Sequence, residues 1–361
     1  FEEKERVAEF LTQYYSYSEI TENKKGELIT SEKKIYYSSA IGLDPDVKRY
    51  YPYGTLAANV IGFTGTDDIG RSGVELKYDT MLTGTPGRII TAQNGKSDIM
   101  SQEFETIYDA ERGTSLVLTI DEVIQRYLED ALEQGYIDSK GAGAYGIVMD
   151  VNTGAILAMA TSSPFDLNNP WGLDEKSQQI LNNTLAEGYT EDSDEYNDIS
   201  RALLTTMWSN KAVTESYIPG STFKIITSSM ALEEKLVNLT ESIVCPGYRT
   251  LYGHKIHCHV TAGHGTLSFP TGLQQSCNVW FMELGGRLGV QKYKNYVEMF
   301  GYTEKTGIDL PGEGSGIFAS QMTDLDLAIY AFGQNFNVTP MQQLTAIASV
   351  ANGGTLITPY L

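Results

Sequence analysis

The sequence predicts an α+β fold in which helices pack on an antiparallel sheet, preceded by an irregular α+β module. Two apolar runs, Tyr145–Asp150 and Ala155–Ala160, flank the turn sequence Asn152-Thr-Gly154, which is typical of a β-hairpin. Helical segments are then expected to dominate the chain as far as Gly353. A hairpin followed by a long helical stretch is typical of an α+β fold.

Length and local composition indicate two domains. At 361 residues the chain can form two domains with separate cores. Residues 1–48 are polar, with a helical start and a lysine-rich turn, and residues 49–112 are rich in glycine and tyrosine. We therefore expect an irregular α+β module over residues 1–112 and a second domain over residues 113–361.

The second domain is expected to begin with a strand and a helix. The strand is predicted over Thr114–Ile120 and the helix over Asp121–Gln134, with Asp121 as its N-cap. The hairpin then supplies the first two strands of the sheet. The segment Ser177–Tyr196 is polar and acidic, which predicts a loop.

Charge and hydropathy exclude several classes of partner. The net charge is −20, whereas binding to nucleic acid or to anionic lipid needs clustered lysine and arginine. We therefore expect no nucleic-acid partner. The hydrophobic share of 41% is typical of a globular protein, and no run of about 18 apolar residues could span a membrane.

The most informative segment is Tyr217-Ile-Pro-Gly-Ser-Thr-Phe-Lys224. A Pro-Gly turn leads into Ser-x-x-Lys, and the apolar run Ile225–Leu232 follows. On a helix that begins at Ser221, the i,i+3 spacing puts its hydroxyl and the Lys224 amine on one face. A helix N-terminus also favours negative charge that develops nearby. This combination predicts acyl transfer through a covalent serine, with lysine as the base.

The base role requires that Lys224 be uncharged. An ordinary lysine, with a pKa of about 10.4, is almost fully protonated at neutral pH. We expect burial without a carboxylate partner to lower the pKa of Lys224 toward neutrality. The same spelling occurs at Ser31-Glu-Lys-Lys34, in a charged stretch with no apolar helix behind it, and we interpret that match as chance.

A second motif, Ser276-Cys-Asn278, lies between the helical run Thr271–Gln275 and the apolar run Val279–Met282. Its Ser and Asn are two residues apart, so a tight turn can aim both side chains into one cleft. Ser276 would pass a proton between Lys224 and a leaving amine. Asn278 would hold a substrate amide.

Both motifs, in this order, resemble the S-x-x-K and S-x-N signatures of the penicillin-binding protein and serine β-lactamase superfamily. Six further segments resemble the class B penicillin-binding proteins: Arg49–Ala58, Gly73–Glu75, Leu82–Gly87, Leu116–Gln125, Thr306–Glu313 and Gly333–Pro340. The resemblance implies the penicillin-binding transpeptidase fold for residues 113–361. It also implies that residues 1–112 are an N-terminal pedestal or dimerisation-type module.

The third signature of that superfamily is K-T-G. Lys305-Thr-Gly307 has this sequence, but Pro311 follows within four residues, which suits a turn better than a central strand. It also precedes Gly333–Pro340, whereas the K-T-G of the family follows that region. We therefore do not take it as the third motif. We expect that motif, together with the last strands of the sheet, beyond Leu361.

The resemblance also implies a function. It is that of a peptidoglycan D,D-transpeptidase, which cross-links stem peptides ending in D-alanyl-D-alanine through an acyl-serine and is acylated by β-lactams. Ser221, Ser276 and Asn278 would contact the substrate, and no cofactor is implied. The same resemblance implies an extracytoplasmic location on a bacterial cell membrane, an N-terminal anchor outside this chain, and a membrane glycan polymerase as partner.

Two alternatives remain open on the sequence. A β-lactam hydrolase would share the serine and lysine motifs but would not need the N-terminal module. A non-catalytic penicillin sensor or a scaffold for wall synthesis would keep the module without turnover of a peptide.

Cysteine and histidine gather in one part of the chain. The three cysteines are Cys245, Cys258 and Cys277, and the four histidines are His254, His257, His259 and His264. An extended Lys255–Val260 would put His257 and His259 on one face and Cys258 on the other.

Three interpretations of this cluster stay open. The first, which has most weight, is a polar loop with ordinary thiols. The second is a redox pair of Cys258 and Cys277, which an extracytoplasmic location permits and which weakly favours a sporulation-type member. The third is structural zinc bound by Cys245, Cys258, His264 and Cys277, a chemically acceptable ligand set with no standard spacing. We assign no metal ligand from the sequence.

Overall fold

The computed structural model describes residues 2–22, 24–37, 48–90, 106–319 and 321–361. The chain divides into two compact units, Phe1–Lys48 and Arg49–Leu361. No helix among the described residues is both long enough and apolar enough to cross a membrane.

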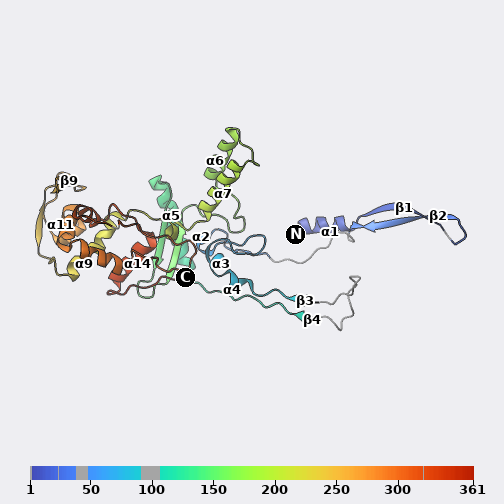
Figure 1. Ribbon diagram of the computed structural model, residues 1–361, viewed down its shortest axis with the longest axis horizontal. Coiled ribbons are helices and arrows are strands. Elements are labelled where there is room, and N and C mark those ends of the chain that lie inside the picture. Colours follow the sequence, from blue (N-terminus) through green and yellow to red (C-terminus); the bar gives the residue numbers. More distant parts are fainter. Residues whose placement is uncertain (1, 23, 38–47, 91–105, 320) are drawn as a thin grey trace. The chain divides into compact units, whose positions relative to one another are not determined.

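The first unit is a helix followed by a β-hairpin (Figure 1). Helix α1 spans Glu2–Leu11, and strands β1 (Tyr14–Glu22) and β2 (Leu28–Tyr36) pair in antiparallel register. The second Ser-x-x-Lys lies on β2, where residues three apart point to opposite faces. Ser31 donates to the backbone oxygen of Glu19 and Lys34 donates to the Tyr14 hydroxyl, so this match forms no serine–lysine pair.

The second unit begins with short elements. They are α2 (Ala58–Ile61), α3 (Gly73–Lys77), α4 (Asp79–Thr83), β3 (Arg88–Ile90) and β4 (Thr106–Tyr108). The buried Glu75 carboxylate accepts hydrogen bonds from Arg49 and from the Tyr51 hydroxyl, which ties the start of this unit to α3.

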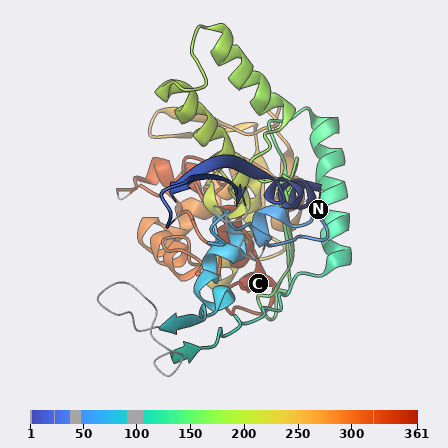
Figure 2. The same cartoon turned by 90° about the vertical axis from the view of Figure 1, so that its right-hand side faces the viewer.

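The predicted helix and hairpin are present. Helix α5 (Glu122–Ser139) is capped by Asp121, which accepts from two backbone N–H groups of the first turn. Strands β5 (Tyr145–Met149) and β6 (Ile156–Thr161) form the antiparallel hairpin, and α5 lies along it (Figure 2). The fully buried Gln125 joins them, because its side-chain amide both donates to and accepts from the backbone of Met159.

The predicted strand over Thr114–Ile120 is wrong. This segment forms no strand. Its Thr114 N–H donates to the Met81 oxygen and its Thr119 hydroxyl to the Ile156 oxygen, and the N–H of Asp121, just after it, donates to the Leu157 oxygen. Backbone pairing at this end of β6 is instead made by Tyr360, whose oxygen accepts from the Ile156 N–H at 2.9 Å.

The loop predicted over Ser177–Tyr196 is also wrong. Two helices, α6 (Glu175–Ala186) and α7 (Asp194–Trp208), cover most of it and pack side by side (Figure 1). Asp174 and Ser193 cap them, and acidic residues occupy both first turns, where the helix dipole favours negative charge. The segment therefore holds the end of α6, with Leu181 as a buried anchor, and the start of α7.

Helices dominate the remainder, as predicted. They are α8 (Lys211–Thr214), the 3₁₀ turn η3 (Gly220–Phe223), α9 (Lys224–Glu233), α10 (Phe269–Gln274), α11 (Asn278–Leu288), α12 (Val290–Met299), α13 (Asp324–Tyr330) and α14 (Pro340–Ala351). Two small antiparallel pairs join them: β7 (Ser242–Cys245) with β10 (Gly265–Ser268), and β8 (Tyr248–Leu251) with β9 (His254–His257).

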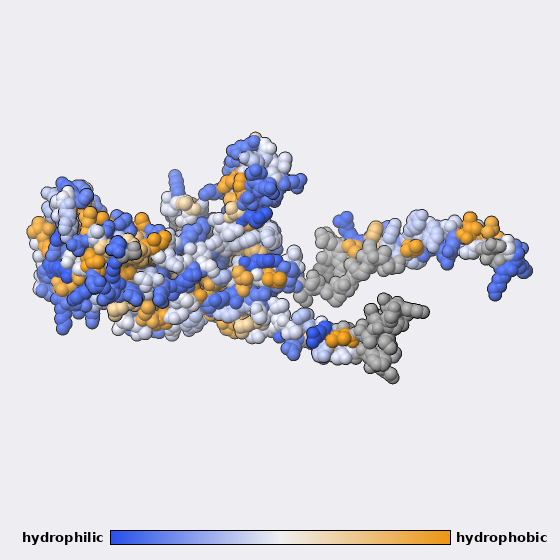
Figure 3. Space-filling model, viewed as in Figure 1, coloured by the Kyte–Doolittle hydropathy of each residue, from blue (hydrophilic) through white to orange (hydrophobic). Residues whose placement is uncertain are grey.

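The helical core lies around α9 and α11, which pack together (Figure 1). Trp280 and Phe281 of α11 are fully buried, as are Phe223 and Tyr302, whose rings lie 5.3 Å apart. The outer face is largely hydrophilic with scattered apolar patches (Figure 3), in keeping with the strongly negative net charge.

A close approach of two glycines fixes the turn that carries Ser221. The Gly220 N–H donates to the Gly333 oxygen at 2.8 Å, and a Cβ atom on Gly333 would lie only 1.8 Å from the Gly220 oxygen. Tyr217 and Val338 exchange a pair of backbone hydrogen bonds at 2.9 Å beside this contact. The serine turn is therefore held by a segment far away in the sequence.

We expect Gly333→Ala to destabilise the fold much more than Gly353→Ala. Both glycines have a positive φ, +86° and +90°, but only Gly333 faces backbone within 4 Å. Overpacking of this kind costs about 2 kcal/mol or more beyond the shared conformational strain. Urea unfolding of the two variants measures the difference, and equal losses would contradict the importance of the glycine contact.

Candidate active site

Ser221 and Lys224 meet because a short 3₁₀ turn leads directly into helix α9. Gly220 has a φ of +56°, which turns the chain after Pro219, and η3 and α9 follow without a break. Phe223 anchors this turn in the core. The i,i+3 spacing then brings Lys224 Nζ within 3.2 Å of Ser221 Oγ, with the hydroxyl exposed and the amine buried.

Ser276 and Asn278 are positioned by the junction of two helices. Helix α10 ends in a Schellman motif: Cys277 N–H donates to the Gly272 oxygen and Ser276 N–H to the Leu273 oxygen. Ser276 takes the left-handed position of this motif, with a φ of 53°, which usually belongs to glycine. Helix α11 then begins at Asn278.

The four side chains form one hydrogen-bonded group. Lys224 Nζ donates to Ser276 Oγ at 2.8 Å, to the Ser276 backbone oxygen at 2.7 Å and to Asn278 Oδ1 at 2.7 Å. Ser276 Oγ in turn donates to Ser221 Oγ at 2.7 Å. The two hydroxyls and the amine thus form a closed triangle.

The hydrogen-bond partners around Lys224 Nζ suit the neutral form of the amine. Four oxygen atoms surround Lys224 Nζ, but an ammonium has only three N–H donors. A neutral amine can donate to the Ser276 backbone oxygen and to Asn278 Oδ1 and can accept a proton from a hydroxyl through its lone pair. This is the arrangement that a general base requires.

Burial lowers the pKa of Lys224, as the role of a general base requires. Desolvation lowers the pKa of Lys224 to about 8, while the nearby thiols of Cys258 and Cys277 act in the opposite direction. The side chain of Lys224 is 1% exposed, and none of the partners that the structure gives it is a carboxylate. At this pKa about one amine in ten is neutral at pH 7, against about one in several thousand for an ordinary lysine.

Lys305-Thr-Gly307 lies in a loop, not in a strand. The Glu313 carboxylate accepts from the backbone N–H groups of Thr306 and Gly307 and from the Thr306 hydroxyl, and Lys305 is exposed. None of the three residues joins the group around Lys224 in the part of the chain that the structure describes.

The cysteine and histidine cluster lies beside this group. The three cysteines are buried and carry free thiols, whereas His257 and His259 are exposed. Asn278 Nδ2 reaches the His257 backbone oxygen at 3.5 Å, so the cluster adjoins the active group. The redox pair of Cys258 and Cys277 stays a prediction.

A network that sequence reasoning missed braces this region. Glu283 of α11 accepts from both Arg249 of β8 and Arg287, and Arg287 also binds Glu241 and the Leu236 backbone oxygen. The network ties the small strands to the helix that begins at Asn278. Only the i,i+4 spacing of Glu283 and Arg287 could have indicated it from the sequence.

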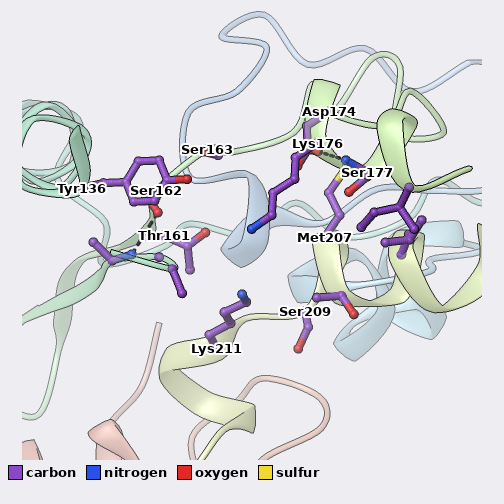
Figure 4. A pocket seen from close by; sticks show the side chains of 16 residues that line it. Tyr136, Thr161, Ser162, Ser163, Asp174, Lys176, Ser177, Met207, Ser209 and Lys211 are labelled. Carbon is purple, nitrogen blue, oxygen red and sulfur yellow. Dashed lines mark hydrogen bonds between the residues drawn. The ribbon is translucent and has the colours of Figure 1, made fainter. Parts of the chain in front are cut away.

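A separate cavity of about 280 Å³ lies between α5, the hairpin and the α6–α7 pair (Figure 4). Lys176 and Lys211 extend into it beside the hydroxyls of Tyr136 and Ser162. Among the described residues neither lysine forms a hydrogen bond with a hydroxyl, so this cavity lacks an activated nucleophile. Ser221 is therefore the better candidate for a catalytic nucleophile.

Comparison with known proteins identifies the family of the chain. Residues 144–361 match the family model "Penicillin binding protein transpeptidase domain", and residues 2–118 match "Penicillin-binding Protein dimerisation domain". The chain is 33% identical over 365 residues to Stage V sporulation protein D of Bacillus subtilis, covering 99% of this chain and 52% of that protein. It is 28% identical to peptidoglycan D,D-transpeptidase FtsI of Escherichia coli, covering 87% and 48%.

Solved structures share the fold. Penicillin-binding protein 3 of Mycobacterium tuberculosis matches with a TM-score of 0.66 and 25% identity, over 95% of this chain and 63% of that one. The same protein has been solved with aztreonam and with ampicillin. The chain spans about half the length of the curated relatives that it matches.

The left-handed backbone at Ser276 yields a stability prediction. Ser276→Gly and Ser276→Ala both remove the hydroxyl, but only alanine keeps the strain of a positive φ. We expect the glycine variant to be more stable than the alanine variant by about 1 kcal/mol in denaturant unfolding. An alanine variant that equals or exceeds it would show that the Schellman motif is not maintained.

Proposed function

Because the chain belongs to the class B penicillin-binding protein family, we propose that it carries the serine site of a peptidoglycan D,D-transpeptidase. Residues 113–361 would form the catalytic domain and residues 1–112 its N-terminal pedestal or dimerisation-type module. The observation that carries the proposal is the triangle of Ser221, Lys224 and Ser276 around a buried amine.

The first half-reaction follows from this triangle. Neutral Lys224 takes the proton of Ser221, whose oxygen attacks the carbonyl carbon of the substrate amide. The Ser221 N–H lies at the start of a helical turn, where backbone donors lack intrahelical partners, and it would stabilise the oxyanion. Ser276 then passes the proton from Lys224 to the departing amine as the C–N bond breaks.

The second half-reaction runs through the same groups in reverse. An acceptor amine attacks the acyl-Ser221 ester and loses its proton to Lys224, directly or through Ser276. The serine oxygen leaves and recovers its proton. Asn278 would orient the substrate through Nδ2, because its Oδ1 is occupied by the lysine amine.

The substrate proposal rests on the relatives. FtsI of Escherichia coli is named as a peptidoglycan D,D-transpeptidase, and the Mycobacterium tuberculosis protein has been solved with β-lactams. We therefore take the donor to be a stem peptide ending in D-alanyl-D-alanine and the acceptor to be the amine of a neighbouring stem. β-Lactams would acylate Ser221 as mimics of the donor.

Location and partners follow the same proposal. Peptidoglycan lies outside the bacterial cytoplasm, so we place this chain on the outer face of the cell membrane, held by an N-terminal anchor. A membrane glycan polymerase would supply the strands that it cross-links. Penicillin-binding protein 2 of Helicobacter pylori, a structural neighbour at 22% identity, was solved in a complex with MreC.

Labelling with a fluorescent penicillin tests the nucleophile. We expect Ser221→Ala to abolish the covalent label, because Ser221 carries the exposed hydroxyl of the triangle, whereas Ser276 is half-buried and serves to pass the proton. Ser31→Ala is the matched control, since it removes the serine of the second Ser-x-x-Lys and should label like the wild type. A Ser221→Ala variant that labels at the wild-type rate would contradict the assignment of Ser221 as the nucleophile.

Turnover separates the transpeptidase from its alternatives. A peptide donor ending in D-alanyl-D-alanine, supplied with a D-amino acid acceptor, should yield both free D-alanine and the exchanged peptide. A penicillin sensor would give neither product, and a hydrolase would give D-alanine without the exchanged peptide and would release bound penicillin quickly. Either result would contradict the proposed reaction.

The pKa of Lys224 predicts the pH dependence of acylation. Because the pKa of Lys224 is lowered to about 8, its amine becomes mostly neutral above about pH 8, whereas an ordinary lysine does so only above pH 10. The rate of penicillin acylation should therefore rise nearly tenfold per pH unit below pH 8 and level off above it. The thiols of Cys258 and Cys277 and the imidazole of His264 face the amine and are the other titrating groups to be controlled.

Removal of the amine provides the companion measurement. Lys224→Ala should lower the acylation rate by about 10² to 10⁴-fold, the usual contribution of a general base. It should also lose the rise toward pH 8. A wild-type profile that still climbs steadily past pH 9.5 would show that the pKa of Lys224 is not lowered, and a Lys224→Ala variant that is acylated at the wild-type rate would remove Lys224 from the base role.

A further inference from the structure

Four potential ligands converge next to the active group from four separate elements. Cys245 ends β7, Cys258 follows β9, His264 precedes β10 and Cys277 precedes α11. Their ligand atoms, three Sγ and one imidazole nitrogen, all lie within 4.8 Å of one another. Residues so far apart in sequence have no local reason to share one point.

The spacing of these atoms is close to that of a tetrahedral metal site. Zinc binds thiolate sulfur at about 2.3 Å and imidazole nitrogen at about 2.0–2.1 Å, which gives ligand–ligand edges of about 3.5–3.8 Å. Cys258 Sγ and His264 Nδ1 lie 3.7 Å apart. The widest separation, 4.8 Å, needs only small side-chain rotations to close.

The backbone holds the ligand loops in place. Gly247 and Gly263 lie on crossing segments, and a Cβ atom on Gly247 would lie 2.1 Å from the Thr261 oxygen. A Cβ atom on Gly263 would lie 2.5 Å from the Cys245 oxygen. Only glycine fits at either position, so the two loops approach closely without a ligand to draw them together.

The three sulfur atoms are buried together, and backbone N–H groups gather around one of them. Cys245, Cys258 and Cys277 are 0%, 2% and 0% exposed, and no disulfide joins them. The backbone N–H groups of Val260, Asn278 and Val279 are directed at Cys258 Sγ. Such N–H donors stabilise negative sulfur and serve as the outer shell of metal–thiolate sites.

We propose that Cys245, Cys258, Cys277 and His264 bind one Zn²⁺ ion as a closed tetrahedral site. Soft thiolates with one imidazole select zinc over the hard cations Mg²⁺ and Ca²⁺. Binding forms three Zn–S bonds and one Zn–N bond and releases the three thiol protons to solvent. All four positions are taken by protein, so the ion is structural and leaves no place for a substrate.

The position of Cys277 gives the ion a structural role in the active group. Cys277 lies between Ser276 and Asn278, whose side chains both bind the Lys224 amine. A bond from zinc to Cys277 Sγ therefore fixes the segment that carries these two groups. The site stands whether or not the chain is a transpeptidase, because its evidence lies only in the ligand geometry.

Metal analysis of the wild-type protein tests the proposal directly. Protein purified under reducing conditions should contain one zinc ion per chain by mass spectrometry of the metal. Replacement by Co²⁺ should produce the visible bands of tetrahedral cobalt and a near-ultraviolet thiolate charge-transfer band. Removal of zinc by a strong chelator should lower the unfolding midpoint by about 5 °C or more, and added zinc should restore it.

Variants identify the ligands. Cys245→Ser and His264→Ala should lose zinc, whereas His254→Ala should retain it, because His254 is exposed and is not one of the four ligands. His259→Ala is the sharper control, because His259 Nδ1 also lies 3.7 Å from Cys258 Sγ but on an exposed side chain. We expect it to keep the metal.

Two outcomes would overturn the inference. One is wild-type protein that stays free of zinc after incubation with the ion while all three thiols react with a thiol reagent. The other is a Cys258–Cys277 disulfide in protein isolated without reductant, with no zinc bound after its reduction, which would favour the redox pair instead.

Discussion

The burial of a single amine is the constraint on which the active region depends. Lys224 is almost completely removed from solvent, so its Nζ needs polar partners that water would otherwise supply. These partners come from two distant segments, the 3₁₀ turn at Ser221 and the junction at Ser276 and Asn278. The Gly220–Gly333 contact, the Schellman motif and the aromatic packing under Phe223 all serve to bring those segments to the amine.

Local patterns in the sequence predicted much of the fold. The Asp121 cap, the hairpin at Asn152-Thr-Gly154 and the i,i+3 pairing of Ser221 and Lys224 each depend on residues within one or two turns. Family resemblance supplied the fold, which the comparisons bear out. The strand expected over Thr114–Ile120 failed because strand formation needs a partner ladder, and its propensity alone could not show that the partner was absent.

Features set by tertiary contacts were out of reach of sequence reasoning. The acidic segment Ser177–Tyr196 has the composition of a loop, but most of it is helical, and its Ser193, Asp194 and Glu195 supply the cap and the first turn of α7. The left-handed φ of Ser276 could not be read from a residue that normally avoids it. The convergence of Cys245 with Cys258 and His264 depends on strand pairing between elements far apart in the chain.

The contact between Gly220 and Gly333 indicates where mutations outside the active group could change its reactivity. The orientation of the Ser221 hydroxyl is set partly by a segment that lies far from it along the chain. If the chain performs the proposed reaction, selection by a drug can therefore act on residues 333–338. A substitution there would tilt the serine turn and slow the attack by Ser221 while leaving Ser221, Lys224, Ser276 and Asn278 themselves unchanged.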